Sequence, residues 1–444
     1  MPPFNINLNL KLGRRGGGTV VGLDIQPGYV AAVEARVNGS ILVQRAVGAP
    51  LAADTVREGE VLDEGALSST LRDLFENSDL GKRVRIGVAN QRTVLRTLEL
   101  PPVTDAKELA AAVRFQAEDQ VPMPLGNAVL DFQPLGVFDT PNGPRQRVIL
   151  VAAQRDMVER LLSAVREAGL RPEGVDLSAF ALIRSLYRAD ADDAGRVLYL
   201  NVGGLTNMAI AEGTVCRFTR VVGGGLEAMA AEVAERRSIP LTDARLLLSS
   251  IDLTAEPAVA VAPAPVVPAA EQEPAPVVEP DPSDADADSE SSVAEHEPEA
   301  QALDPDAQEP ATADQDASEP TAALDEPDSS EAPPAEPASV AVSPPVDIDA
   351  DVRTVLENGV REIAGEVRNS LDFHRSQEGG GDVSTVVLSG PALEIAGFAE
   401  MLEADLGVQV RRETVRAAQD GAFGQVSAEH LAIAAGLAAE EVHA

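Results

Sequence analysis

The residues best suited to chemistry in this sequence lie where short strand-like runs end. Asp24 closes an apolar run and is followed by the turn Gln26-Pro27-Gly28. A carboxylate beside exposed backbone N–H groups can hold a phosphate and, through water, a Mg²⁺ ion. An ordinary hairpin with a solvated aspartate gives the same pattern. This motif alone therefore leaves both interpretations open.

A second loop repeats this geometry later in the chain, with its polar and glycine positions at Asn201, Gly203, Gly204, Thr206 and Asn207. Two facing hairpins of this kind can clamp the phosphates of one nucleotide from both sides of a cleft. Together the two loops predict a phosphate site more specifically than either does alone.

Two further glycine-containing turns complete this set. Ser389 and Gly390 stand between a strand-like run and a helix, where a glycine lets an adenine or ribose approach the backbone. Gly223, Gly224 and Gly225 open another helical run. We expect both turns to face the same cleft.

Other catalytic arrangements do not occur in the sequence. The histidines have no zinc-ligand spacing, and we find no Ser-His-Asp or Cys-His grouping and no P-loop motif. Glu366 and His374 share one helical run. A surface carboxylate and a hydrogen-bonded or solvated histidine are the simpler interpretations of this pair.

Two strand-turn-strand-turn-strand units position the first two loops, one over 19–47 and one over 196–222. Such a repeat predicts an internally duplicated α/β fold with a cleft between its halves. Periodicity predicts further strands over 83–89, 94–100, 129–137, 147–153, 383–389 and 408–411. It predicts helices over 63–75, 105–119, 156–168, 226–237, 241–250, 346–376, 395–406 and 429–442.

Negative charge is concentrated in one segment. The 444-residue chain has a formal net charge of −37, and residues 251–345 hold 24 of its 72 Asp and Glu and no Lys or Arg. Residues 255–345 also hold 18 of the 32 prolines, which predicts a disordered, extended insert within a domain. This acidity and an aromatic content of 3% argue against nucleic acid as a partner.

The single cysteine, Cys216, excludes an internal disulfide and fits a reducing cytoplasm. Its strand-like surroundings predict a buried, unreactive thiol. The basic residues near the start are followed by no apolar stretch, so we expect no signal peptide. No apolar run approaches the ~18 residues of a membrane span. We therefore expect a cytoplasmic protein that reaches a membrane only through a partner.

The first residues form a separate feature. Residues 4–10 read Phe-Asn-Ile-Asn-Leu-Asn-Leu, and strict alternation of this kind predicts a strand that adds to an exposed sheet edge. A frayed terminus is the simpler interpretation.

The loops described above occur in an order that resembles the actin-like ATPase superfamily, which includes FtsA. Residues 22–24, 201–207, 223–225 and 388–392 correspond to its phosphate-1, phosphate-2, connecting and adenosine elements. Four longer stretches resemble the PilM family of type IV pilus proteins, namely LRTLELP at 95–101, AAAVRFQAEDQVPMPLGNAVLDFQPL at 110–135, VILVAAQRDMVERLLSAVREAGLRPEGVDLSAFAL at 148–182 and EVRNSLDFHRSQ at 366–377.

The resemblance implies an actin-like, ribonuclease H-like duplicated fold with four subdomains around a nucleotide cleft. The expected limits are 1–18 for a flexible N-terminal segment, 19–91 and 169–193 for subdomain 1A, 92–168 for 1C, 194–235 and 381–444 for 2A, 236–254 and 346–380 for 2B, and 255–345 for the disordered insert.

The resemblance also implies ligands and partners. Family members bind ATP in the cleft, so the implied nucleotide contacts are Asp24, Gln26, Gly28, Asn201, Gly203, Gly204, Thr206, Asn207, Gly223, Gly224, Gly225, Glu366, Ser389 and Gly390, with Asp24 holding Mg²⁺. They grip an N-terminal tail of the membrane protein PilN between 1A and 1C, which implies partner contacts at Leu95, Arg96, Leu98 and Phe115.

The implied setting is peripheral to the inner face of the plasma membrane, where such a protein links PilN to the cytoplasmic pilus motor ATPases. Ile6-Asn7-Leu8 also resembles the core of the PilN tail. Residues 4–10 are therefore expected to occupy the same groove, in the same molecule or in a neighbour, and to compete with PilN.

Three departures from the family pattern bear on the cleft. Gln26 and Pro27 replace a glycine and a small residue, Asn201 replaces an aspartate, and Pro391 stands where the adenosine loop has glycine. These changes predict weakened or lost nucleotide chemistry.

Three functions stay open at this point. The first is an adaptor that recruits PilN and motor components. The second is an active Mg-ATPase in which Asp24 holds the metal and Asn201 positions water. The third is an FtsA-like filament protein, although the acidic, Ala-rich C-terminal run lacks the basic face of a membrane helix.

Overall fold

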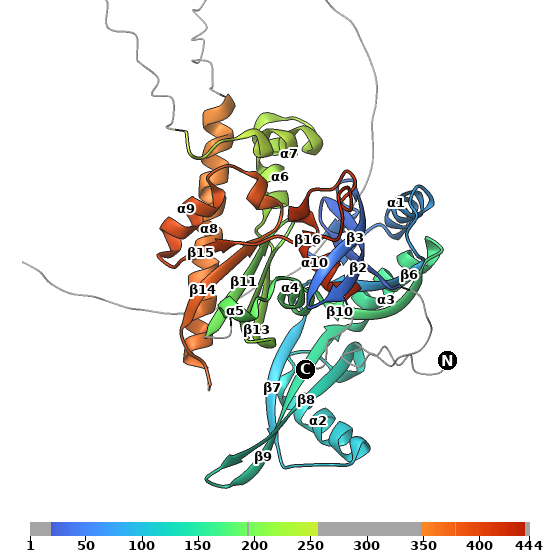
Figure 1. The fold of residues 1–444 in the computed structure, drawn as a ribbon, viewed down its shortest axis with the longest axis vertical. Helices are drawn as coiled ribbons and strands as arrows, with labels where there is room; N and C mark the ends of the chain where they lie inside the picture. Colours follow the sequence, from blue (N-terminus) through green and yellow to red (C-terminus); the bar gives the residue numbers. More distant parts are fainter. Residues whose placement is uncertain (1–18, 193–194, 256–347, 378, 440–444) are drawn as a thin grey trace, which may run out of the picture. The chain divides into compact units, whose positions relative to one another are not determined.

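The computed structural model describes residues 19–192, 195–255, 348–377 and 379–439. A six-stranded sheet is built around the hairpin of β1 and β2 (Figure 1). β3 extends the hairpin in antiparallel fashion, while β6 adds in parallel on the far side of β1. Across the sheet the strands are β10 (Arg171–Leu177), β6 (Arg83–Val88), β1 (Val21–Gln26), β2 (Tyr29–Asn38), β3 (Ser40–Pro50) and β16 (Arg416–Ala417).

A five-stranded sheet repeats this plan. Three antiparallel strands again adjoin a parallel pair, because β14 adds in parallel beside β11. Its strands are β13 (Val215–Val222), β12 (Thr206–Glu212), β11 (Arg196–Val202), β14 (Val383–Ser389) and β15 (Val410–Arg412). The predicted duplication of an α/β unit is therefore confirmed.

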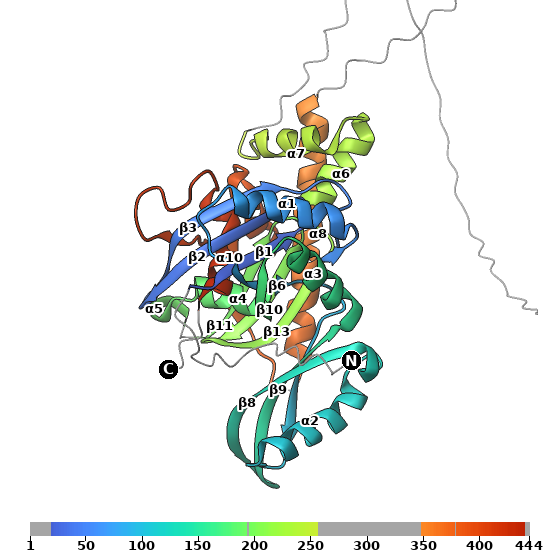
Figure 2. The same cartoon turned by 90° about the vertical axis from the view of Figure 1, so that its right-hand side faces the viewer.

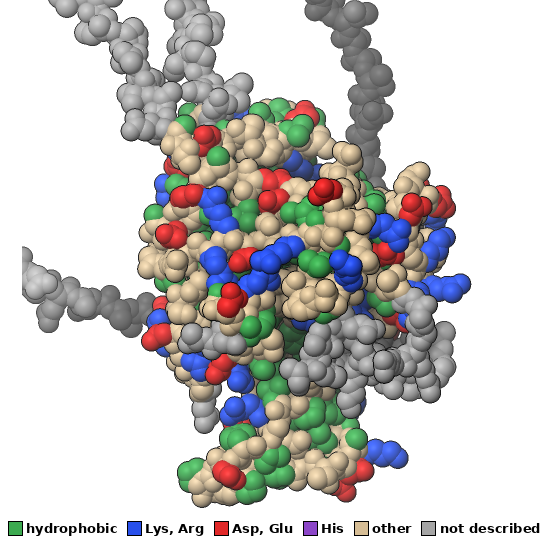
Figure 3. Space-filling view, in the orientation of Figure 1, with side chains coloured by type: hydrophobic (Ala, Val, Ile, Leu, Met, Phe, Trp, Pro, Cys, Tyr) green, Lys and Arg blue, Asp and Glu red, His purple; other side chains and the backbone are tan. Residues whose placement is uncertain are grey.

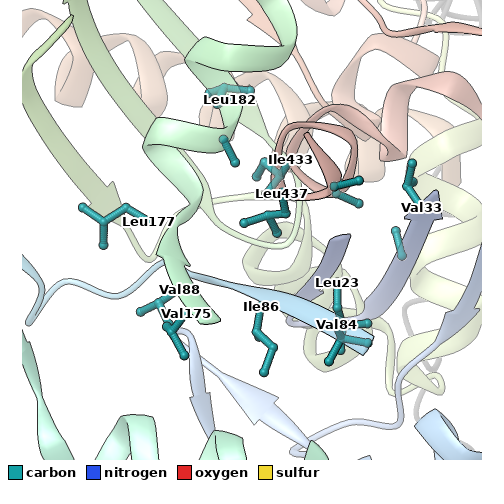
Figure 4. Packing of buried hydrophobic residues seen from close by; sticks show 14 of the residues in the cluster. Leu23, Val33, Val84, Ile86, Val88, Val175, Leu177, Leu182, Ile433 and Leu437 are labelled. Carbon is teal, nitrogen blue, oxygen red and sulfur yellow. The ribbon is translucent and has the colours of Figure 1, made fainter. Parts of the chain in front are cut away.

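Two short helices, α4 (Ser178–Leu186) and α10 (Ala432–Ala438), pack against each other and against strands of the sheets. α4 contacts β6 and β10 of the first sheet and β11 and β12 of the second. Figure 4 shows Leu437 of α10 between Leu182 of α4 and Ile86 of β6. The approach is close, since a Cβ on Gly22 would lie 1.9 Å from the Ala434 carbonyl oxygen.

Further helices cover the other sides of the sheets or pack on the helices that do. The second sheet packs against an apolar stripe of α8 that includes Val360, Ile363 and Val367. Asp63 caps α1 by accepting a hydrogen bond from the Ala66 N–H at 2.8 Å. The helices on the outer sides of the sheets are α1 (Glu64–Glu76), α3 (Arg155–Glu167), α6 (Leu226–Arg237), α7 (Leu241–Ser250), α8 (Ile348–Ser376) and α9 (Phe398–Leu406).

A three-stranded antiparallel sheet forms a block with its own core. Its strands are β7 (Val94–Leu100), β9 (Gly143–Gln154) and β8 (Ala128–Thr140), in that order. α2 (Ala106–Gln120) covers one face (Figure 2). Its Leu109 and Val113 belong to one buried cluster with Leu98 and Leu100 of β7.

Short elements complete the described chain. They are β4 (Val56–Arg57), β5 (Glu60–Val61), α5 (Ala189–Asp192), η1 (Leu125–Asn127), η2 (Pro391–Glu394) and η3 (Ala428–His430). No helix in the described ranges is both long and apolar enough to cross a membrane.

Several sequence expectations differ from these elements. The closing helix expected over 429–442 is η3 followed by the short α10, and the strand expected over 129–137 extends to Thr140. β10 and α4 were not predicted. The N-terminal strand expected over 4–10 and nearly all of the expected insert lie outside the described residues. The subdomain limits stay a prediction.

Cys216 behaves as its sequence context predicts. It is 4% exposed, and burial raises the pKa of its thiol to about 12.

Candidate functional site

Asp24 and Gln26 form a buried pair at the end of β1. The two residues are neighbours on one face of the strand, since side chains alternate with a period of two. Gln26 Nε2 donates to Asp24 Oδ2 at 2.7 Å, and the residues are 1% and 2% exposed respectively. Burial raises the pKa of Asp24 from 3.8 to about 7, which the Gln26 bond and nearby His430 oppose only in part.

The turn after β1 places Tyr29 beside His430. Gly28 adopts a φ of 90°, which closes the two-residue turn and returns the chain as β2. The Tyr29 ring meets His430 edge-on, with ring centroids 4.7 Å apart. His430 Nε2 in turn lies 3.4 Å from Glu394 Oε1, and this contact lowers the pKa of Glu394 against the opposing effect of burial.

The second hairpin presents amides and glycines. Asn201 Nδ2 lies 3.1 Å from Ser389 Oγ and donates to it, while Thr206 Oγ1 donates to the Gly224 carbonyl at 2.6 Å. Asn201 and Asn207 are 2% and 1% exposed. Within the described chain, Asn201 Oδ1, Asn207 Nδ2 and Gln26 Oε1 are buried without a hydrogen-bond partner.

The two hairpins touch. A Cβ on Gly204 would lie 2.1 Å from the Pro27 carbonyl oxygen, and one on Gly203 would lie 2.6 Å from Gln26 Oε1. Real Cβ atoms do not tolerate such distances, so only glycine fits here. The first turn therefore occupies the space in front of the second loop.

A cavity of about 450 Å³ opens beside this contact. Gly28, Gly203 and Gly204 border it, as do Tyr29, Glu394 and His430. Its remaining wall is largely apolar and includes Val30, Ala49, Pro50, Leu226, Leu248, Pro391, Ile395 and Val426.

An ion pair lies in the wall of the cavity. Arg245 of α7 donates from Nε to Glu227 Oε2 at 2.9 Å and from Nη1 to the Leu51 carbonyl at 3.3 Å. Both side chains are about four-fifths buried, at 22% and 20% exposed. A Cβ on Gly28 would lie 2.7 Å from Glu227 Oε2, so the carboxylate rests against the first turn. Among the described lining residues, Arg245 is the one Arg or Lys.

Some expected nucleotide contacts lie away from the cavity wall. Glu366 pairs with Arg220 of β13 at 2.8 Å, and a Cβ on Gly223 would approach Gln91 Nε2. Gly225 packs on the second loop, and Gly390 packs on Val202. Asp24, Gln26, Asn201, Thr206, Asn207 and Ser389 do cluster at the hairpin ends, but as buried groups at most 2% exposed.

His374 differs from its sequence expectation. It is 3% exposed, packs 6.0 Å from the Phe218 ring, and has no hydrogen-bond partner for either ring nitrogen in the described chain. Burial lowers the pKa of this imidazole, because the charged form would lose its hydration.

The expected partner contacts divide into two pairs. Leu95 and Leu98 are 9% and 3% exposed and belong to the core. Phe115 on α2 is 76% exposed, and Arg96 on β7 is exposed as well. Of the four expected contacts, Arg96 and Phe115 are the two with exposed side chains.

Four residues of the cleft escaped the sequence argument, namely Glu227, Arg245, Glu394 and His430. No local pattern marks them, because they come from four separate elements. The Asp24–Gln26 bond did carry a signal, since residues two apart on a strand share a face.

A family model described as type IV pilus assembly protein PilM matches residues 22–244, which is half of the chain. The chain belongs to the PilM family. A solved structure of a PilM-PilN type IV pilus biogenesis complex has 19% sequence identity and a TM-score of 0.64, and the likeness covers 95% of this chain and 98% of that one. The actin-like fold is thus shared with this PilM structure.

Two further solved structures match this chain at lower TM-scores. EutJ, an ethanolamine utilization protein of Carboxydothermus hydrogenoformans, is 12% identical with a TM-score of 0.43, covering 96% of this chain and 91% of its own. MreB 5 of Spiroplasma citri bound to AMPPNP is 10% identical with a TM-score of 0.43, covering 95% of each chain.

The PilM resemblance implies a Mg²⁺-triphosphate in the cleft, and the donor set does not fit that group. The Asp24 carboxylate already accepts from Gln26, and Asn201 supplies a neutral amide. Arg245 is already paired with Glu227, so an entering polyphosphate meets carboxylates without an available cation.

Proposed function

We propose that this PilM-family chain is an adaptor of a type IV pilus assembly complex. In this role it binds the N-terminal tail of an inner-membrane protein of the PilN kind and links it to cytoplasmic motor ATPases. The family match carries the proposal, and the fold shared with a PilM-PilN complex supports it. The chain then works in the cytoplasm, held at the inner face of the membrane by its partner.

The proposed contact surface is the block of β7, β8, β9 and α2. Apolar side chains, drawn in green, gather over this block in the lower part of Figure 3. Phe115 on α2 is 76% exposed and Val137 on β8 is 59% exposed, so both elements of the block present apolar side chains to solvent. A short peptide with apolar anchors suits such a surface.

The nucleotide cleft is proposed to have weak or no hydrolytic activity. The Asp24 carboxylate, which would hold the metal, accepts a hydrogen bond from the Gln26 amide. The turn at Pro27, which would face the phosphate, is in contact with the opposite loop at Gly204. Adaptor function in this proposal depends on the shape of the folded chain rather than on turnover of ATP.

A fluorescence anisotropy titration with a labelled PilN-type tail peptide tests the adaptor role. Phe115→Ala is expected to weaken binding by about tenfold, the loss typical of an exposed aromatic anchor. Leu246→Ala on α7 is the matched control, since Leu246 is 69% exposed but lies on a different element. If the wild-type protein does not bind the peptide, or if both variants bind equally well, this surface is not the site.

Residues 4–10 are proposed to compete for the same surface, within one molecule or between two. Deleting residues 1–15 is then expected to tighten peptide binding in the same titration. Unchanged affinity after the deletion rules out this competition.

A further inference from the structure

The cleft contains three contacts that the adaptor proposal does not use. One joins Gln26 to Asp24, another joins the Pro27 turn to Gly204, and the third joins Glu227 and Arg245 to the first sheet. We propose that the chain's own side chains occupy the metal and phosphate positions of this cleft and hold its two halves together without a nucleotide. This inference rests on the proposed loss of nucleotide chemistry and explains how the closed cleft is maintained.

Gln26 takes the position of a metal-bound water. A water held on Mg²⁺ would donate a hydrogen bond to the Asp24 carboxylate, and the Gln26 amide N–H makes that donation directly at 2.7 Å. Gln26 is 1% exposed, so the amide fills the space in which a hydrated ion would lie.

Glu227 takes the position of an anion against the first turn. Its Oε2 lies close enough to Gly28 that a Cβ there would approach it to 2.7 Å. Arg245 holds this carboxylate through two guanidinium nitrogens, an arrangement with the directionality of an arginine–phosphate pair.

Arg245 also ties the two halves together. The guanidinium of this α7 residue donates to the Leu51 carbonyl, which directly follows β3 of the first sheet. A phosphate that enters here must separate Arg245 from Glu227 and then lie beside the Glu227 and Glu394 carboxylates. We call the three contacts the clasp. The clasp is therefore an electrostatic barrier to a phosphate as well as a link between the two halves.

Calorimetric titration with Mg-ATP tests the clasp on the full-length chain. The wild type is expected to give no binding heat at millimolar nucleotide. The variant Gln26→Gly with Glu227→Ala, which removes both substitutes, is expected to give measurable binding, with a Kd about tenfold or more below the millimolar limit that the wild type sets. Glu232→Ala is the matched control on α6, because this carboxylate pairs with Arg236 in the same helix and is about half exposed. Wild-type binding as tight as the double variant, or no binding by either, overturns the proposal.

Hydrogen exchange on the wild type gives a second test that needs no variant. The amides of Gln26, Gly28 and Tyr29 and of residues 203–205 are expected to exchange equally slowly with and without Mg-ATP. Fast exchange that slows when nucleotide is added overturns the clasp.

The peptide titration separates this inference from the adaptor proposal. The double variant is expected to bind the PilN-type peptide as the wild type does, since Phe115 and the cleft belong to different elements. If the wild type does not bind the peptide, the adaptor proposal is wrong and the clasp proposal is unaffected. The calorimetric titration tests the clasp proposal alone.

Discussion

The two hairpins that meet in the cleft share a backbone plan but differ in what they present. In the β1–β2 hairpin, Gln26 and Tyr29 flank a two-residue turn and fill the space around it with side chains. In the β11–β12 hairpin, Gly203 and Gly204 leave the backbone bare. We call the β1–β2 hairpin the filled hairpin, because its side chains fill the space at the contact. We call the β11–β12 hairpin the receiving hairpin, because its bare loop accommodates them.

This difference explains why the substitutions in the first hairpin are tolerated. The Pro27 carbonyl and Gln26 Oε1 would each collide with a Cβ in the second loop, so bulk on one side requires glycine on the other. In the clasp proposal, this close contact between hairpins replaces the gap that a bound phosphate needs. Each experiment below changes one side of this contact.

The largest effect is expected from filling the receiving loop. Gly204→Ala places a Cβ 2.1 Å from the Pro27 carbonyl oxygen, and since the obstacle is backbone, the whole turn must shift. Overpacking of this kind costs about 3 kcal/mol of the free energy of unfolding. Urea denaturation measures the loss.

Gly126→Ala serves as the control for this substitution. A Cβ on Gly126 would meet nothing within 4 Å, so the free energy of unfolding should change by less than about 0.5 kcal/mol. An equally small change for Gly204→Ala would show that the hairpins separate readily.

A smaller effect is expected from removing the charge of the filled hairpin. The pKa of Asp24 is about 7 in the folded chain and 3.8 in its unperturbed state, so folding favours the protonated carboxyl. The protonated Asp24 carboxyl therefore contributes to the free energy of unfolding in full below about pH 3.8, and this contribution is lost as the pH rises through about 7. Asp24→Asn, which keeps an oxygen for the Gln26 amide, is therefore expected to stabilise the protein by about 2 kcal/mol at pH 8.

Unfolding at pH 4 and pH 8 measures this effect as the difference between variant and wild type. The comparison removes the contributions of other groups, such as His374, whose lowered pKa makes the protein less stable as the pH falls. A difference that stays constant between the two pH values would show that Asp24 is ionised in the folded chain.

The sequence predicted the parts of the molecule that local patterns determine. The two three-stranded units and the long amphipathic α8 follow from alternation and helical spacing, because each buries one face. β10 and α4 were missed because they follow each other directly as short runs, without a turn residue between them.

The site was predicted less completely than the fold. The sequence identified Gln26 as bulk where a phosphate would approach, but not as the hydrogen-bond donor of Asp24, although their spacing contained that information. Tyr29 and His430 are ring partners about four hundred positions apart in the chain, and Glu227 and Arg245 meet only after α6 and α7 have packed. Such contacts depend on tertiary packing, which periodicity does not encode.

The smallest net effect is expected from exchanging the polar groups of the two hairpins. Asn201 is as buried as Asp24, at 2% exposed, and the Ser389 hydroxyl beside it can turn to donate to a carboxylate. The double variant Asp24→Asn with Asn201→Asp should therefore unfold within about 1 kcal/mol of the wild type at pH 5. It should also lose stability toward pH 8, as the wild type does, because burial raises the pKa of a carboxyl group in either hairpin. If the exchange variant instead behaves like Asp24→Asn alone, the receiving hairpin can hydrate a carboxylate that the filled hairpin cannot, and the two halves differ in access to water as well as in bulk.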